Sequence, residues 1–128
     1  MISFEKIPNK LPVGDACKAQ SPWPNLGQGF ALNQFYRQYS SAEGWLGEEY
    51  LAIWSVGEIL EFRTSSSLMY PENYNFFGSN GSGTQFGFII EDKGVLFISA
   101  PDIGDIDDVR VNGSWEDLIR AIENSEYI

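Results

Sequence analysis

Aspartate and glutamate supply most of the side chains in this sequence that could do chemistry. Eighteen acidic residues stand beside a single cysteine, Cys17, and no histidine. Without histidine, neither a Ser–His–Asp nor a Cys–His arrangement can form, and a histidine-ligated zinc or haem site is excluded. Because no imidazole is available to lower the pKa of Cys17, we expect a packed thiol and not a nucleophile.

The densest run of carboxylates lies in residues 102–108. A calcium-binding EF-hand loop needs acidic ligands at its first, third and fifth positions and glycine at its sixth. Counted from Asp105, the fifth and sixth positions are Val109 and Arg110, so this pattern fails. We interpret the run as a solvated acidic loop. A contact surface for a basic partner is the second interpretation, and a metal site is the last.

The segment from Gly78 to Thr84 contains enough glycine to wrap a phosphate. A phosphate-binding P-loop also needs a lysine before its hydroxyl residue and a helix directly behind it. Neither is expected here, so we interpret the segment as a hairpin connection. Pairs of acids such as Glu58 and Glu61 carry little information among eighteen carboxylates. We therefore predict no catalytic, cofactor-binding or metal-ligating residues, and a protein that is not an enzyme.

The charge of the sequence restricts its partners more than its motifs do. Eighteen acidic and eight basic residues give a net charge of −10. Residues 48–128 hold fifteen of the acids and only four basic residues. Nucleic acid and anionic membranes would be repelled by such a surface, whereas a basic protein would be attracted. Solubility alone is the alternative explanation of the acidity.

Apolar spacing predicts three helices that must carry these side chains. The first begins at Phe30 and ends in the polar segment 40–44, and its apolar residues recur with helical spacing. The second follows Ser55, which with Glu58 matches a reciprocal N-terminal cap, and gives way to a loop over 64–74. The third follows a cap at Ser114. The apolar stripes of the first and third helices are Leu32, Phe35, Tyr36 and Tyr39, and Trp115, Leu118, Ile119 and Ile122.

The remaining apolar runs predict strands. We expect strands at 50–54 (buried on both faces), 74–78, 85–90 and 95–99, a turn at 91–94, and an edge strand at 109–111. Residues 1–27 contain four of the six prolines; we expect a short element near Ile2–Ile7 and otherwise an irregular arm. The mixed order of elements predicts a single α+β domain over 1–128, a mostly antiparallel β-sheet with helices packed against it.

The location of the protein is predicted from what the sequence lacks. The first residues, Met1 to Lys6, carry charges and are not followed by the apolar run of a signal peptide. No apolar stretch approaches the roughly 20 residues that cross a bilayer. The single unpaired Cys17 fits a reducing compartment. We expect a cytoplasmic protein.

Two blocks of the sequence carry a family resemblance. Glu43-Gly44-Trp45-Leu46-Gly47-Glu48-Glu49-Tyr50-Leu51 is followed at a characteristic distance by Phe77-Gly78-Ser79-Asn80-Gly81. In this pattern, and in the flanking segments from Phe30 to Ile122, the chain resembles the SUKH superfamily. Members of that superfamily include bacterial immunity proteins and fungal cell-wall-assembly regulators.

The resemblance implies an α+β fold and a protein that binds without catalysing. It suggests an immunity protein that neutralises a cognate toxin, such as a basic nuclease, and carries over no catalytic residue. The alternative is a regulatory or scaffold module with endogenous partners. The resemblance also suggests that Gly44, Gly78 and Gly81 form turns and that Trp54, Phe86 and Phe88 lie in the core.

The charge argument and the resemblance together suggest where a partner would bind. Acidic residues would attract a basic surface, and an exposed aromatic side chain would anchor it. The residues that we predict to contact the partner are Trp45, Glu48, Glu49, Glu91, Asp92, Asp102, Asp105, Asp107 and Asp108.

Overall fold

The computed structural model describes residues 4–12, 23–27, 29–66, 70–101 and 106–127. The strands of this part of the chain form one antiparallel sheet, in which each strand pairs with the next along the sequence. The strands are β1 (Lys10–Pro12), β2 (Tyr39–Leu46), β3 (Glu49–Ile53), β4 (Tyr74–Ser79), β5 (Thr84–Glu91), β6 (Gly94–Pro101) and β7 (Arg110–Gly113). The prediction of a small α+β domain with a mostly antiparallel sheet is confirmed.

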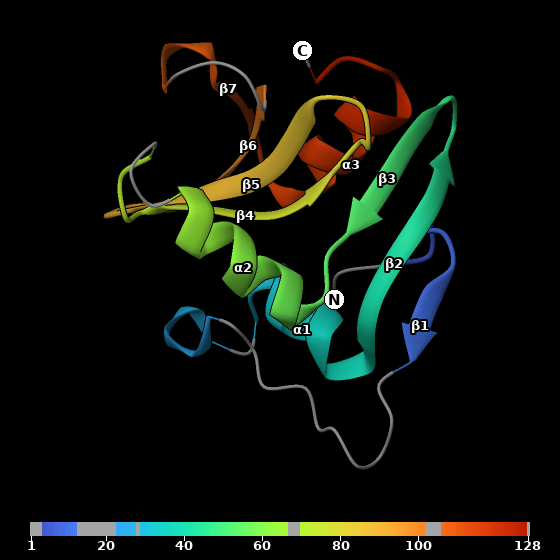
Figure 1. Ribbon diagram of the computed structural model, residues 1–128, viewed down its shortest axis with the longest axis horizontal. Coiled ribbons are helices and arrows are strands. Elements are labelled where there is room, and N and C mark those ends of the chain that lie inside the picture. The colour runs from blue at the N-terminus through green and yellow to red at the C-terminus, as the bar shows by residue number, and fades with distance from the viewer. Residues whose placement is uncertain (1–3, 13–22, 28, 67–69, 102–105, 128) are drawn as a thin grey trace.

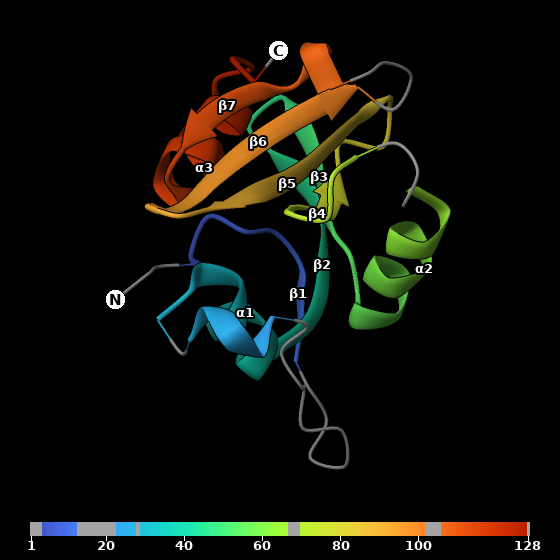
Figure 2. The same ribbon diagram turned by 90° about the vertical axis from the view of Figure 1, so that its left-hand side faces the viewer.

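Helices lie on both sides of this sheet. In Figure 1, α2 stands in front of the sheet and α3 behind it, and Figure 2 shows the same two helices on opposite sides of β4 and β5. The helices are α1 (Ala31–Gln38), α2 (Val56–Ser66) and α3 (Trp115–Glu123), with single 3₁₀ turns η1 (Pro24–Leu26) and η2 (Ile106–Asp108).

Reciprocal caps begin α2 and α3 where the sequence predicts them. The Ser114 hydroxyl accepts a hydrogen bond from the Asp117 backbone N–H (3.1 Å), and the Asp117 carboxylate accepts one from the Ser114 backbone N–H (3.0 Å). Ser55 and Glu58 exchange the same pair of bonds at 3.3 and 3.1 Å. Both predicted caps are confirmed, although α2 runs on to Ser66 and so extends into the predicted loop.

Two hydrophobic clusters occupy the two faces of the central strands. On β5, Phe88 joins the larger cluster with α1 and α3, whereas its neighbour Ile89 joins the smaller one. On β6, Phe97 and Ile98 divide in the same way, since successive side chains of a strand point to opposite faces. Phe62 of α2 packs against the smaller cluster. The strands β4 to β6 are therefore the common wall of both clusters.

The segment 39–46 is a strand, which corrects the prediction that a helix ends there in a polar linker. The helix stops at Gln38, and Tyr39 begins β2. The strand is not evident in the sequence because most of its residues are polar. Only alternate positions of β2 face the core, and Ala42 and Leu46 occupy two of them. Backbone pairing with β1 on one side and β3 on the other further stabilises this strand.

Strand β3 is buried on one face, whereas the sequence predicts burial on both. Leu51 and Ile53 are 1% and 2% exposed, but the alternate residues Tyr50 and Ala52 are only half-buried. Trp54, expected in the core, is also half-buried and packs at the edge of both clusters. Half of the β3 surface therefore faces away from the core.

Two of the three glycines expected in turns lie in strands. Only Gly81, with φ of 75°, sits in a turn. A Cβ on Gly78 would lie 2.3 Å from the Ala52 carbonyl oxygen, so glycine is needed there for β4 to approach β3. A Cβ on Gly44 in β2 would meet the side chain of Asn9 at 2.7 Å. Gly78 thus allows two strand backbones to approach closely, whereas Gly44 leaves room for the side chains of Pro8 and Asn9.

The described part of residues 1–27 is packed against the larger cluster, and it contains one strand, at Lys10–Pro12, that the sequence does not predict. Phe4, Ile7 and Trp23 are buried in the larger cluster. Lys10–Pro12 forms β1, although prolines in this region argue against a strand. Pro12 is tolerated because β1 is short and lies at the edge of the sheet. Cys17 lies outside the described residues.

Candidate protein-binding surface

The outer side of β1 to β3 is a sheet face that no helix of the described residues covers, because α2 lies against β4 and α1 and α3 pack on the inner side (Figures 1 and 2). Alternation along β2 directs Glu43 and Trp45 outward. Trp45 is 68% exposed, the largest exposed fraction among the bulky apolar side chains of the described residues. We call this surface the open face; it comprises Leu11, Ser41, Glu43, Trp45, Tyr50 and Ala52.

Neighbouring side chains hold the exposed indole of Trp45 in place. Tyr50, its cross-strand partner, packs edge to face against it at 5.5 Å between ring centroids. The Tyr50 hydroxyl donates to the Glu43 carboxylate at 2.6 Å, and this hydrogen bond raises the pKa of Tyr50 above its ordinary value. Trp45, Tyr50 and Glu43 thus form an ordered aromatic and acidic group before any partner arrives.

A groove of about 330 Å³ continues the open face toward α2. Leu11 at its margin is 57% exposed, and after Trp45 it has the largest exposed fraction among the bulky apolar side chains of the described residues. The groove ends at Trp54 and Glu58, where a further hollow includes Glu61 and Phe62 of α2. Apolar side chains and carboxylates therefore alternate from Glu43 on the open face to the first turns of α2.

The junction of β3 with α2 is fixed by hydrogen bonds, and this positions the end of the groove. The Trp54 backbone N–H donates to the Phe77 carbonyl oxygen at 2.8 Å. The Trp54 carbonyl oxygen accepts from the Tyr36 hydroxyl of α1. Burial, with a smaller contribution from the charge of Glu58, raises the pKa of Tyr36, so this hydroxyl remains a donor.

The charged side chains along the groove are all negative. Among the described residues, neither the groove nor the hollow beside it is lined by lysine or arginine. Lys10 of the adjacent strand turns away, since its ammonium group donates to the carbonyl oxygens of Phe4 and Ile7 at 3.1 and 2.9 Å. Glu43, Glu58 and Glu61 therefore act on this face without a neutralising cation in its lining.

The open face has the composition of a contact surface. Aromatic side chains ringed by polar groups are typical of the residues that dominate binding energy between proteins. Carboxylates at the margin select a positively charged partner and speed its approach.

Three of the predicted contact residues lie on the β2–β3 hairpin. Trp45 is central to the open face, and Glu48 is exposed in the turn. Glu49 points to the inner side, where it accepts hydrogen bonds from Tyr127 and Ser125 at 2.6 and 2.8 Å. The structure therefore gives Glu49 a partner within the molecule, whereas Glu48 has none among the described residues.

The other predicted acids lie elsewhere and not all together. Glu91 and Asp92 are exposed at one end of the β5–β6 hairpin, whereas η2, with Asp107 and Asp108, follows the other end of β6. The eight residues of β6 separate the two ends by about 25 Å at the usual rise of a strand. Asp102 and Asp105 lie outside the described residues.

Sequence reasoning missed the carboxylates that border the open face. Glu43 is exposed because it alternates with buried residues of β2, and this periodicity is visible only if 39–46 is assigned as a strand. The sequence indicates a helix cap for Glu58 and a carboxylate pair with Glu61, but it does not predict that either borders this face. Their exposure beside Trp54 follows from the direction of α2, which local sequence does not specify.

Within the described residues, no group of three or more cysteine or acidic side chains is arranged to hold a metal ion. None of their helices is long and apolar enough to cross a membrane. Models of protein families give no match to this chain, and a search of curated proteins finds no relative. Membership of the SUKH superfamily stays a prediction.

Proposed function

We propose that this chain is a non-catalytic binding protein that neutralises a basic toxin by covering part of its surface with the open face. The observation that carries the proposal is Trp45, ordered by Tyr50 and Glu43 and yet 68% exposed. Leaving a tryptophan in water forgoes the stabilisation that its burial would give, so a partner that covers it gains that free energy.

Charge supports a basic partner. The sequence carries a net charge of −10, and the groove beside Trp45 is bordered by Glu43 and Glu58 with no cation in its described lining. A nuclease toxin needs a positively charged surface to hold the phosphates of its substrate. An acidic protein that binds there would be drawn in rapidly and would exclude the nucleic acid.

The first experiment identifies the partner and tests the function together. The tagged full chain is purified from its native host, the bound chains are identified, and each is expressed with and without this chain. We expect one partner to be basic and toxic, and growth to be restored by co-expression. A partner set of non-toxic host proteins would contradict neutralisation and favour a regulatory or scaffold module.

The second experiment tests the surface. Trp45→Ala should weaken binding of the identified partner at least about thirtyfold, as expected for a central aromatic anchor. Glu43→Gln should weaken it less and reduce its dependence on salt. Leu60→Ala and Glu126→Gln, two exposed positions away from the open face, should leave the affinity unchanged. The measurement is titration calorimetry at several salt concentrations.

Equal affinity of Trp45→Ala and the original chain would remove the open face from the binding mechanism. That result would leave the toxin experiment to decide whether neutralisation occurs through another surface, such as the exposed acids Asp107 and Asp108.

A further inference from the structure

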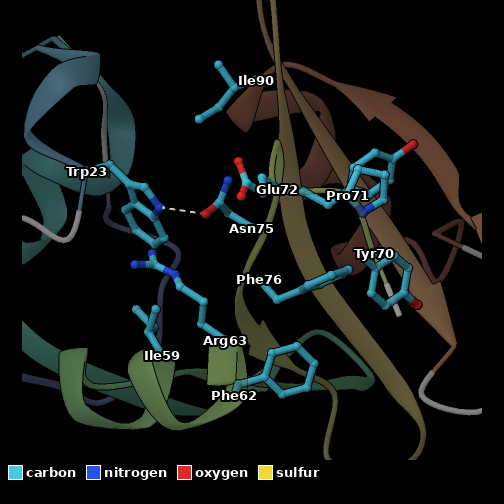
Figure 3. Close-up of a pocket in the computed structure, with 11 residues that line it drawn as sticks. Trp23, Ile59, Phe62, Arg63, Tyr70, Pro71, Glu72, Asn75, Phe76 and Ile90 are labelled. Carbon is cyan, nitrogen blue, oxygen red and sulfur yellow. Dashed lines mark hydrogen bonds between the residues drawn. The ribbon is translucent and has the colours of Figure 1, made fainter. Parts of the chain in front are cut away.

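A cavity, distinct from the groove of the open face, lies between α2, β4 and the segment that carries Trp23 (Figure 3). Its volume of about 460 Å³ falls in the range of small-molecule sites in proteins. Ile59 and Arg63 of α2 line it, whereas Glu58 and Glu61 of the same helix border the open face. The cavity shares Phe62 with the hollow beside the groove but no residue with the groove itself, and the proposed function does not use it.

Aromatic rings form one wall of the cavity and support one another. Phe76 packs edge to face with Phe62 at 5.5 Å between centroids and tilted against Tyr70 at 4.9 Å. Tyr70 in turn stacks on Tyr74 at 5.9 Å. Phe76 and Tyr70 are 5% and 9% exposed, so both rings are held firmly in the sheet side of the cavity. Such a wall suits a flat apolar group.

The opposite side of the cavity is polar. Figure 3 shows the Arg63 side chain reaching from α2 to a position beneath the indole of Trp23. Among the described residues, no side chain forms an ion pair or hydrogen bond with the Arg63 guanidinium. The Asn75 side-chain oxygen accepts from the Trp23 indole N–H at 3.1 Å, which fixes the amide and leaves its NH₂ group to donate. Both groups are donors facing one cavity.

We propose that this cavity binds a small apolar monocarboxylate, with its ring or branched chain against Phe76 and its carboxylate on Arg63. A guanidinium pairs with a carboxylate through two parallel hydrogen bonds, and Asn75 supplies a further donor in the same cavity. The aromatic wall buries the apolar body of the ligand.

The other charged group in the lining restricts the ligand to one negative charge. Glu72 lies at the exposed rim of the cavity, and the chain as a whole is strongly acidic. A phosphate ester would bring two negative charges to a site with one cation in its described lining. A cationic ligand would be repelled by the guanidinium of Arg63. The site therefore selects a monoanion.

The test uses two probes that share a ring and differ in charge: 3-phenylpropanoate and 2-phenylethylamine. Binding is followed by NMR of the indole N–H signals, because Trp23 is the tryptophan that lines the cavity. We expect 3-phenylpropanoate to shift the Trp23 signal in a saturable way at millimolar concentration. Arg63→Gln should weaken this binding about tenfold or more, since a charged hydrogen bond is lost.

Arg120→Gln is the matched control, because it removes the same charge from an exposed position on α3, on the opposite side of the sheet. It should leave the affinity for 3-phenylpropanoate unchanged. The proposal is overturned if the carboxylate produces no saturable shift of Trp23, if Arg63→Gln binds it as well as the original chain, or if 2-phenylethylamine binds as tightly. None of these outcomes depends on toxin binding, so the proposed function is tested separately.

Discussion

The carboxylate of Glu49 ties the C-terminal segment to the β2–β3 hairpin. It accepts hydrogen bonds from the hydroxyls of Tyr127 and Ser125, and Tyr127 also accepts one from the Asn80 side chain at 2.9 Å. The bond from Tyr127, and then that from Ser125, lowers the pKa of Glu49 below its ordinary value. Burial and the nearby carboxylate raise the pKa of Tyr127, so its hydroxyl stays a donor.

We expect this carboxylate to make stability depend on pH. Because the folded state lowers the pKa of Glu49, its stabilisation is complete well above the ordinary pKa of 4.5 and is lost as the pH falls through the folded-state value. Glu49→Gln should therefore be less stable than the original chain at pH 7, and the difference should shrink in acid. Urea unfolding at a series of pH values measures it.

Glu48→Gln is the control for this effect, since Glu48 is the exposed neighbour in the hairpin turn. Its stability should follow that of the original chain at every pH. A constant difference between Glu49→Gln and the original chain down to strongly acidic pH would show that the charge of Glu49 does not stabilise the fold.

At the scale of single elements, the start of α3 is fixed by its cap. Ser114→Ala removes the hydroxyl that accepts from the Asp117 N–H and leaves that group to water. We expect a loss of about 1 kcal/mol in the free energy of unfolding, the usual value for such a cap. Thermal and urea unfolding measure this difference.

Ser114→Thr keeps a hydroxyl at the same position and should recover most of the lost stability. If Ser114→Ala is as stable as the original chain, the cap contributes nothing and the apolar contacts of Trp115 and Leu118 alone define the helix.

The elements that the sequence predicts correctly are those specified by near neighbours. The caps at Ser55 and Ser114 each involve residues three positions apart, and the β5–β6 hairpin joins two apolar runs through a short turn. Strands β1 and β2 are not predicted because their residues are polar or include proline, and because the pairing of β1 with β2 joins segments that lie far apart in the sequence.

The candidate surface is less predictable than the fold, because it depends on how elements that are distant in the sequence pack together. Trp45 is identified from the sequence as an exposed anchor, but its acidic neighbour Glu43 requires the orientation of β2. Glu58 reaches the groove only because α2 starts beside Trp54. A net charge can be counted in a sequence, whereas its distribution over a surface depends on the packing of separate elements.

At the scale of the whole molecule, the two hydrophobic clusters share β4 to β6, and we expect them to unfold together. Ile98 and Leu118 are fully buried, the first in the smaller cluster and the second in the larger. Ile98→Ala and Leu118→Ala should each lower the free energy of unfolding by about 2–5 kcal/mol. Each variant should still show one transition, with near- and far-ultraviolet circular dichroism changing at the same urea concentration.

A matched pair at the surface, Val111→Ala and Leu60→Ala, should change the unfolding midpoint little, because both residues are about half exposed. Two separate transitions in Ile98→Ala would show that the side of the sheet covered by α2 melts independently of the side that holds α3.

The two strands at the margins of the sheet are short. Strand β1 has three residues and ends in Pro12, which has no N–H to donate, and β7 has four residues and begins with Arg110. Such margins offer little template for another chain to add a strand, the step that starts fibrous aggregation. We therefore expect these two margins to contribute little to any joining of sheets between copies of this molecule.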